Sequence, residues 1–288
     1  MSIVFENVTY TYMPGTPYQR TAITNINLTI LPGEFLGIIG HTGSGKSTLV
    51  QHMNGLINPT AGKVLVNGVD LSEKSQAVKE TRRKVGMVFQ YPEHQLFEET
   101  VYEDIAFGPR NLGLADEEVK RRVCRAMDFV GLDFEKFKKR SPFNLSGGQM
   151  RRVAIAGVIA LEPEYLALDE PSAGLDPRGR DEIFGQVMKL HQATGVTVIL
   201  VSHNMDDVAR MANRIIVMNH GEISLDGPPR EIFKSGRDKI HAAGVDVPPV
   251  TALLNKLNER GLPVNDDALT VEEAVKSILA VPRGQKKC

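Results

Sequence analysis

A glycine-rich segment near the N-terminus has the composition of a phosphate-binding loop. Residues 40–47 read Gly-His-Thr-Gly-Ser-Gly-Lys-Ser and match the pattern G-x-x-x-x-G-K-[ST]. Glycines let the backbone wrap around phosphate oxygens with its amides pointing inward, and a helix starting near Lys46 adds a partial positive charge. Lys46 is expected to reach the β- and γ-phosphates, and the Ser47 hydroxyl to ligate Mg²⁺. The predicted cofactor-binding residues are Gly40, His41, Thr42, Gly43, Ser44, Gly45, Lys46, Ser47 and Thr48.

An acidic pair follows an apolar run in the second half of the chain. Residues 165–168 are Tyr-Leu-Ala-Leu, and Asp169 and Glu170 come next. Open α/β sheets bind ligands at the carboxyl ends of their strands, so these carboxylates are candidates for the phosphate site. Asp169 suits the second coordination shell of Mg²⁺, and Glu170 could act as general base on the attacking water. The alternative is that the pair only caps the helix that follows.

The elements around these residues alternate between strand and helix patterns. Short apolar runs predict buried strands at 35–39, 86–89, 165–168, 196–201 and 214–218. Helical spacing of apolar residues separates several of them, at 46–54, 179–191 and 205–212. This alternation predicts an α/β fold with a mostly parallel core sheet covered on both faces. Segments 2–12 and 23–30, joined by a Pro/Gly turn, predict an N-terminal antiparallel β-subdomain, and 62–67 predicts a further strand.

Two further regions are predicted to be helical. A helical insertion is expected at about 94–160, with helices at 116–130 and 147–161. A boundary is expected at the Gly-Pro-Pro of 227–229, because the long apolar strands stop there. The chain is therefore divided into a nucleotide-binding domain, 1–227, and a small helical C-terminal extension, 228–288. The extension carries amphipathic stretches at 250–258 and 271–279 and is expected to fray at 283–288.

Composition excludes several classes of protein. The 288 residues carry a formal net charge of −1, so the overall basic charge of a nucleic-acid binder is absent. Cys124 and Cys288 can form at most one bridge, which excludes a disulfide scaffold and fits a reducing compartment. No apolar run approaches the roughly 18 residues that suggest a membrane span, and the N-terminus does not read as a signal peptide. We expect a soluble, cytosolic protein.

Residues 145–149, Leu-Ser-Gly-Gly-Gln, identify a family. They precede a predicted helix and begin 24 residues before Asp169, where the ATP-binding-cassette (ABC) family of P-loop NTPases has its signature motif. Gln90 resembles the Q-loop glutamine, Asp176 ends a segment similar to the D-loop, and His203 resembles the switch histidine. The chain resembles this family from about residue 2 to 227, which implies the cassette fold.

The resemblance implies hydrolysis of ATP between two chains. One chain would supply the phosphate loop and the Mg²⁺ ligands Ser47, Gln90 and Asp169. The residues expected to act in catalysis are Lys46, Gln90, Glu170 and His203 of that chain. The opposing chain would supply Ser146, Gly147, Gly148, Gln149 and Asp176. His203 would hold the γ-phosphate and position the water; the alternative is a core histidine. Tyr12 is expected to stack on adenine, although Tyr10 and Tyr18 are close enough in sequence to do so instead.

The segment after Gln90 indicates a subgroup within the family. Residues 91–111, beginning Tyr-Pro-Glu-His-Gln-Leu-Phe, resemble ATPases of energy-coupling factor (ECF) transporters, in particular the second of two paralogous ATPases. The resemblance implies a pair with a second, non-identical ATPase, held together by the C-terminal extensions. It also implies peripheral attachment at the cytoplasmic face of the cell membrane, and uptake of vitamins or of cobalt and nickel ions.

Two membrane partners are implied by the same resemblance. A transmembrane T-component would dock its coupling helices near residues 90–111 and connect the ATPases to a substrate-binding S-component. Leu96, Phe97, Val101 and Ile105 are candidate apolar anchors, and Glu93, Glu98, Glu99 and Glu103 could meet basic residues of the partner. The alternative is that the apolar side chains pack the core of the insertion.

Two other functions use the same nucleotide chemistry. An importer fed by a soluble binding protein is one alternative; the segment after Gln90 and the C-terminal extension argue against it. A soluble ABC ATPase acting on nucleic acid or the ribosome is the other. The near-zero charge disfavours a polyanion, so no nucleic-acid partner is expected.

Overall fold

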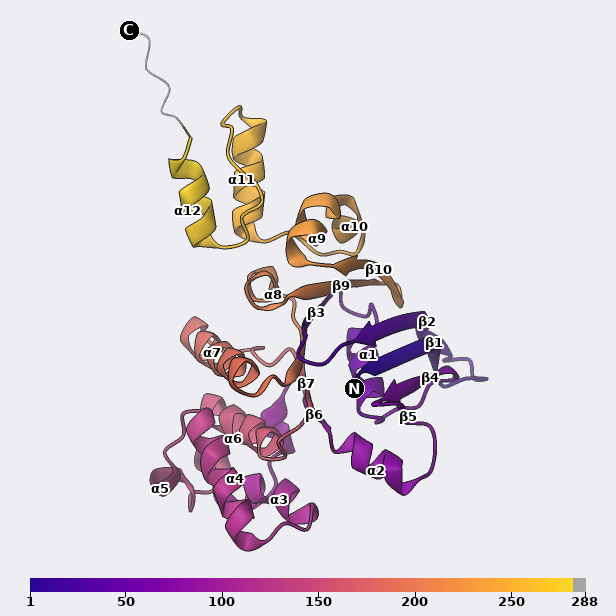
Figure 1. Cartoon of the computed structure of the whole chain (residues 1–288), viewed down its shortest axis with the longest axis vertical. Coiled ribbons are helices and arrows are strands. Elements are labelled where there is room, and N and C mark those ends of the chain that lie inside the picture. The colour runs from indigo at the N-terminus through magenta and orange to yellow at the C-terminus, as the bar shows by residue number, and fades with distance from the viewer. Residues whose placement is uncertain (282–288) are drawn as a thin grey trace.

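Two sheets organise residues 1–281, the part of the chain that the computed structural model describes (Figure 1). The residues expected to fray, 283–288, lie outside it. The first sheet has the order β2-β1-β4-β5 and the second the order β10-β9-β3-β8-β7-β6. The strands are β1 Ile3–Tyr12, β2 Arg20–Ile30, β3 Phe35–Ile39, β4 Ala61–Val66, β5 Val69–Asp70, β6 Val85–Val88, β7 Tyr165–Asp169, β8 Thr197–Val201, β9 Arg214–Asn219 and β10 Glu222–Gly227.

The helices cover both faces of the larger sheet and form the insertion and the C-terminal part of the described chain. They are α1 Lys46–Met53, α2 Gln76–Arg82, α3 Val101–Asn111, α4 Asp116–Phe129, α5 Phe134–Phe137, α6 Gly147–Ile159, α7 Pro177–Thr194, α8 Met205–Met211, α9 Pro229–Ser235, α10 Arg237–Ala242, α11 Pro249–Glu259 and α12 Val271–Leu279. Two 3₁₀ turns, η1 Pro92–Gln95 and η2 Pro142–Asn144, complete them. None of the helices within residues 1–281 has the length and apolar character needed to cross a membrane.

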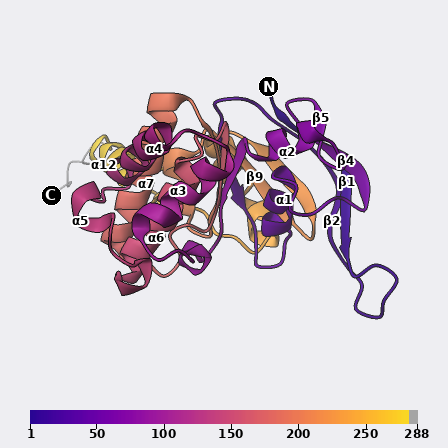
Figure 2. The same ribbon diagram turned by 90° about the horizontal axis from the view of Figure 1, so that it is seen from below.

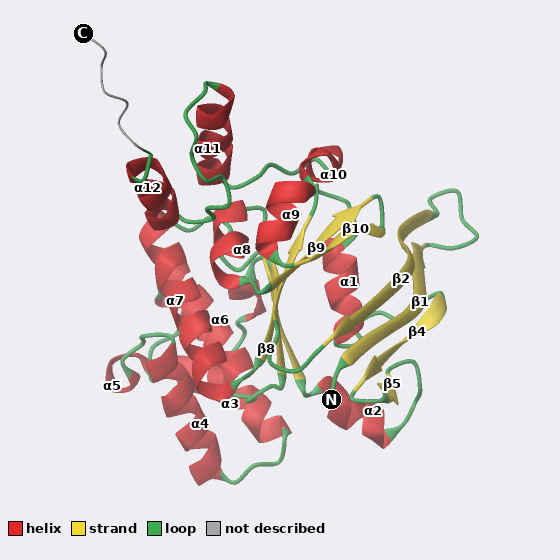
Figure 3. Ribbon diagram, turned by 45° about the horizontal axis from the view of Figure 1, so that its top comes forward, coloured by secondary structure: helices red, strands yellow, loops and turns green. Residues whose placement is uncertain are grey.

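The two sheets differ in strand direction, as the sequence predicts. β1 pairs antiparallel with both β2 and β4. In the larger sheet β9, β3, β8, β7 and β6 run parallel, and only the edge strand β10 is antiparallel. Figure 3 shows α1 between the two sheets, with α6, α7 and α8 on the other side of the larger one.

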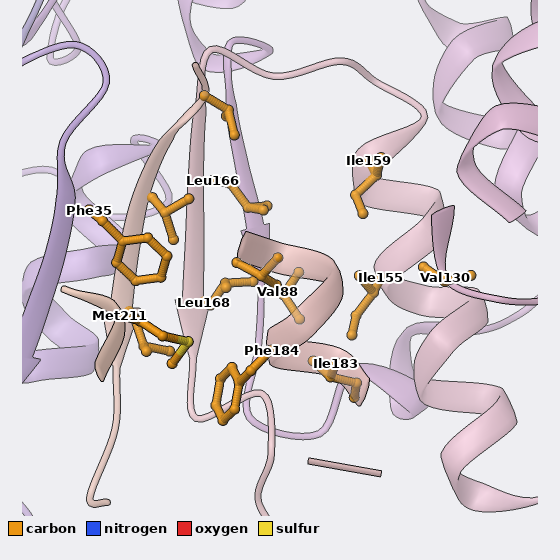
Figure 4. Packing of buried hydrophobic residues seen from close by; sticks show 14 of the residues in the cluster. Phe35, Val88, Val130, Ile155, Ile159, Leu166, Leu168, Ile183, Phe184 and Met211 are labelled. Carbon is orange, nitrogen blue, oxygen red and sulfur yellow. The ribbon is translucent and has the colours of Figure 1, made fainter. Parts of the chain in front are cut away.

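The core is built on the alternation of side chains along the buried strands. Phe35 and Ile39 of β3 face one hydrophobic cluster, whereas Leu36 and Ile38 face the other. The strands β6 to β9 repeat this division, which explains why each reads as an unbroken apolar run. Figure 4 shows Phe184 of α7 and Ile155 and Ile159 of α6, which belong to the first cluster. Packing on both faces fixes the strand ends, where the candidate site lies.

The insertion between β6 and β7 is helical, as predicted, and forms its own side of the molecule (Figure 2). α3, α4 and α6 pack on one another around Val119, Val123 and Met127, which are fully buried. α4 begins with Asp116, Glu117 and Glu118, which favour a helix N-terminus.

The prediction that the four candidate anchors lie on a docking surface is wrong for three of them. Leu96, Val101 and Ile105 are buried in the insertion core, so the alternative holds for them. Phe97 is 57% exposed and packs edge-on against the exposed ring of Phe107, with centroids 4.8 Å apart.

The acidic residues of this segment differ in what they contact. Glu93 is paired with the buried Arg151, and Glu103 with Arg110 on its own helix, so neither carboxylate is free. Neither Glu98 nor Glu99 forms an ion pair with another residue of the described chain. Of the four acidic residues, only Glu98 and Glu99 therefore remain candidates for contact with basic residues of a partner.

The chain after β10 is helical. α9 packs against β9, β10 and α8, and α10 packs on α9, while α11 and α12 form a separate pair around Leu254 and Ala274. One face of α12 is left without a partner in the described chain: Val271, Val275 and Leu279, spaced four residues apart, are exposed. The helices α11 and α12 match the predicted stretches, whereas α9 and α10 lack a periodic signal because each has only six or seven residues.

Candidate functional site

Four of the candidate residues or segments follow neighbouring parallel strands. β3 runs into the phosphate loop, β7 ends at Asp169, β6 leads to Gln90 and β8 leads to His203. Because parallel neighbours end at the same edge of a sheet, these groups lie together although the sequence separates them by many residues.

The phosphate loop has the backbone that its glycines predict. Gly40 has φ +151°, and a Cβ there would lie 2.3 Å from the carbonyl oxygen of Met218. Gly45, with φ +105°, precedes α1, and its Cβ would lie 2.6 Å from the carbonyl oxygen of Ala22. No other residue type fits these two positions without displacing backbone.

Lys46 lies beneath the loop and points back into it. Its Nζ donates hydrogen bonds to the carbonyl oxygens of Gly40, at 2.8 Å, and His41, at 2.9 Å. Burial lowers the pKa of Lys46, and the nearby carboxylates of Glu170 and Asp169 act in the opposite direction. The ammonium group is therefore held where phosphate oxygens would replace the two carbonyl contacts.

Asp169 is a buried carboxylate facing the start of α1. Burial raises the pKa of Asp169, and a hydrogen bond from the Ser47 hydroxyl partly opposes this effect. Because burial makes an unpaired negative charge on Asp169 unfavourable, a cation bound beside its carboxylate would be stabilising. The Ser47 hydroxyl and the Gln90 amide oxygen are neutral oxygen donors of the kind that Mg²⁺ accepts, so the residues present fit that ion.

Glu170 is held from two sides. Its carboxylate accepts a 3.0 Å hydrogen bond from the Gln90 side-chain amide, and the other oxygen lies 2.7 Å from His203 Nε2. The backbone of Glu170 is left-handed, with φ +50°, and its amide donates to the carbonyl oxygen of Val201. A left-handed glutamate is uncommon, and here it turns the chain away from β7 directly after the acidic pair.

His203 is placed by the turn between β8 and α8. Asn204 caps α8 by accepting from the amides of Asp206 and Asp207, and its own amide donates to the Ser202 hydroxyl. The side chain of His203 is 45% exposed. The core-histidine alternative is therefore wrong.

Tyr12 contacts the first turn of α1, directly after the phosphate loop. Its hydroxyl lies 3.1 Å from the hydroxyl of Thr48, and its ring is 39% exposed. Tyr10 instead packs edge-on against Tyr12 and His52, and Tyr18 is 81% exposed. Of the three tyrosines, Tyr12 offers a partly open ring beside the phosphate loop.

The signature residues lie in a different place from the phosphate loop. Ser146 and Gln149 form a reciprocal capping box at the start of α6, and Gly147 and Gly148 have open space where a Cβ would be. Ser146, Gly148 and Gln149 border a cavity of about 540 Å³ that Asp176 also lines and that no residue of 40–48 reaches. One chain thus brings Lys46, Asp169, Glu170, Gln90 and His203 together but keeps the signature apart from them.

Two segments that support the loop have no signal in the sequence. The amide of Gly221, in the β9–β10 turn, donates to the carbonyl oxygen of Ser44. The amide of His41 donates to the carbonyl oxygen of Ala243, just after α10. Both are backbone contacts, so no side-chain pattern could have predicted them.

The chain is similar to known transporter ATPases over nearly its whole length. A profile of the ABC transporter family matches residues 23–173, more than half of the chain. The energy-coupling factor transporter ATP-binding protein EcfA2 of Clostridioides difficile is 53% identical over 288 residues, covering 100% of both chains. The protein of the same name from Clostridium tetani is 53% identical over 281 residues, 98% of this chain and 97% of that one.

Solved structures agree with these relatives. The cbiO1 protein of Clostridium perfringens, described as part of the ABC transporter complex cbiONQ, superposes with a TM-score of 0.72 at 37% identity, covering 83% of this chain and 94% of that one. A dimeric, post-hydrolysis cassette, MJ0796, bound to ADP and Pi gives a TM-score of 0.71 at 31% identity, covering 78% and 98%. Sequence, fold and the arrangement of the site together assign this chain to the ATP-binding proteins of energy-coupling factor transporters, within the ABC transporter family.

Proposed function

We propose that this chain binds and hydrolyses ATP to drive an ECF-type transporter that takes up vitamins or transition-metal ions. The observation that carries the proposal is the carboxylate of Glu170, held between Gln90 and His203 beside the phosphate loop. The names of the relatives support the transporter type.

Substrate binding rests on the loop and α1. Lys46 exchanges its contacts with two loop carbonyls for the β- and γ-phosphates, and loop amides take the remaining oxygens. Tyr12 stacks on the adenine ring. Ser47, Gln90 and Asp169 would hold Mg²⁺, which when bound neutralises phosphate charge and orients the β- and γ-oxygens.

Hydrolysis rests on Glu170 and its two neighbours. Glu170 takes a proton from the attacking water as general base, and Gln90 fixes one oxygen of its carboxylate. His203, from the adjacent strand end, contacts the γ-phosphate and orients the water. Positioning and charge carry most of the catalysis, since phosphoryl transfer needs little covalent help from the protein.

A complete site needs a second ATPase. The signature cavity, lined by Ser146, Gly148, Gln149 and Asp176, does not reach the phosphate loop of its own chain. We infer that it faces the γ-phosphate bound by a second, non-identical ECF ATPase, in a head-to-tail pair. The dimeric form of the related cassette with ADP and Pi supports this arrangement.

The unpartnered face of α12 suits contact between the paired ATPases. Val271, Val275 and Leu279 would bury their apolar surface against the extension of the partner. This contact does not involve nucleotide, so it would hold the pair together when ATP is absent.

The exposed pair Phe97 and Phe107 is the proposed docking site for a T-component. Both rings are exposed, as is Tyr91 next to Gln90, and Glu98 and Glu99 add negative charge beside Phe97. A coupling helix with apolar anchors and basic residues is complementary to this surface. Through it the chain would attach peripherally to the cytoplasmic face of the membrane and act on an S-component.

Uptake by whole cells tests the proposal. In cells whose copy of this chain is replaced by the Glu170→Gln variant, uptake of several labelled vitamins, or of Co²⁺ or Ni²⁺, should fall to the level of a deletion strain. Unchanged uptake of all of these solutes in the deletion strain would reject the proposal. Loss of a single solute that also requires a soluble binding protein would instead identify the other importer type.

A further inference from the structure

Arg151 joins three segments of the site through one buried guanidinium group. It lies on α6, is 3% exposed, and donates from Nε and Nη2 to the two carboxylate oxygens of Glu93, at 3.1 and 3.0 Å. Its Nη1 donates to the carbonyl oxygens of Pro171, at 3.3 Å, and Ala173, at 2.5 Å. All three guanidinium nitrogens thus have partners.

The chemistry of this contact favours a fixed geometry. A guanidinium is planar and presents its donors in a rigid fork, so a bidentate carboxylate and two carbonyls fix its orientation. Burial acts to raise the pKa of Glu93, but the hydrogen bonds and charge of Arg151, a backbone hydrogen bond and the nearby His94 together outweigh it, so the pKa lies below its usual value. Glu93 therefore stays charged, and removing either partner would leave a buried charge without compensation.

The partners of Arg151 flank the catalytic hydrogen bond. Glu93 lies in η1, three residues after Gln90, and Pro171 directly follows Glu170. The side chains of Gln90 and Glu170 meet at 3.0 Å although 80 residues separate them. Arg151 therefore holds the segments on both sides of this contact, through the Glu93 carboxylate on one side and two backbone carbonyls on the other, from a helix that starts with the signature residues.

We propose that Arg151 is a positioning residue that sets Gln90 and Glu170 for hydrolysis and ties them to the signature helix. This inference rests on the proposed ATPase function. Arg151 hydrogen-bonds to Glu93, Pro171 and Ala173 but to no residue of the phosphate loop, so it acts on turnover and not on ATP binding. Because α6 carries the signature, the same contact makes the Gln90–Glu170 geometry sensitive to how the second ATPase engages that helix.

The first test compares Arg151→Met and Arg151→Lys with the wild type in the complex purified from membranes. Methionine keeps the length of the side chain without the charge, and lysine keeps the charge without the fork. Both should lower kcat by about 10- to 100-fold, with the KM for ATP changed by less than about twofold. Arg121→Gln, which breaks an exposed ion pair with Glu118 on α4, should leave both parameters unchanged.

A double-mutant cycle separates the pair from its neighbours. If the pair acts as one unit, Glu93→Gln combined with Arg151→Gln should be no slower than the slower single variant. Additive losses in kcat would show that Glu93 and Arg151 do not act as one unit and would overturn the proposal. A wild-type kcat in Arg151→Lys would overturn it as well.

Hydrogen exchange on the full chain judges the inference without any turnover. Arg151→Lys should speed amide exchange in residues 91–96 and 171–175, while β6 exchanges as in the wild type. If both segments of the variant exchange at the wild-type rate, the proposal is overturned. A wild-type complex without ATPase activity would reject the proposed function, and the exchange result would still decide the role of Arg151.

Discussion

The Nε2 atom of His203 lies 2.7 Å from the carboxylate of Glu170. These residues follow two adjacent parallel strands, β8 and β7, so the sheet itself sets their separation. The contact joins the proposed general base to the residue proposed to contact the γ-phosphate. Loss or movement of the γ-phosphate would therefore act on the general base Glu170 through the side chain of His203.

Glu170→Gln should stop turnover and spare binding. Glutamine keeps an oxygen that can accept from Gln90, but it cannot take a proton from water. The kcat of the purified complex should fall by about 100- to 10,000-fold, with unchanged ATP affinity in an equilibrium binding measurement. Glu164→Gln, near the far end of β7, is the matched control. Hydrolysis at the wild-type rate would show that another group is the base.

Asp169→Asn should raise stability while it lowers activity. Burial raises the pKa of Asp169, so the folded chain binds this proton more tightly than the unfolded chain does. The free energy of unfolding therefore falls as pH rises from the unfolded pKa through the folded pKa, and the penalty persists at neutral pH. Without nucleotide, the variant should melt at a higher temperature at pH 7 and lose this advantage in acid. An equal or lower melting temperature at pH 7 would contradict this reading.

Gly40→Ala should destabilise the loop and everything that depends on it. The added Cβ would meet the backbone oxygen of Met218 at 2.3 Å, and backbone cannot move aside as a side chain can. We expect a loss of about 2 kcal/mol in the free energy of unfolding and weaker ATP binding. Gly15→Ala, at a turn with open space around its Cβ, isolates the effect of the close approach. Normal stability of the Gly40 variant in chemical denaturation would contradict the loop geometry.

Gly148→Asp should separate folding from catalysis. The position has open space and lies in the first turn of α6, where a negative charge stabilises the helix by about 0.5 kcal/mol. The same charge would repel the γ-phosphate bound by the second ATPase. The isolated chain should therefore fold and bind ATP normally, while hydrolysis by the complex at the partner's site is lost. Retained hydrolysis at both sites would contradict the proposed head-to-tail pairing.

The positions of Gln90, Asp169, Glu170 and His203 at one sheet edge could be predicted from the sequence. Each follows a short apolar run, and parallel strands bring such ends together whatever their separation along the chain. Ser146 could be placed as well, because a capping box is a local pattern.

The failures concern residues whose type suits two environments. Leu96, Val101 and Ile105 could equally fill a core or a docking surface, and only the packing of α3 on α6 decides between them. Glu93 is similar, since its buried pairing depends on an arginine 58 residues away. The short helices α9 and α10 give too few turns for a periodic signal.

The most direct test of the transporter assignment is a purification of the tagged full chain from detergent-solubilised membranes of its source cell, followed by mass spectrometry. We expect recovery of a second, non-identical ATPase, one shared membrane scaffold and several small hydrophobic proteins. A Phe97→Lys variant should recover the second ATPase without the membrane proteins. Recovery of the wild-type chain with only a two-subunit permease and a soluble binding protein would contradict the account.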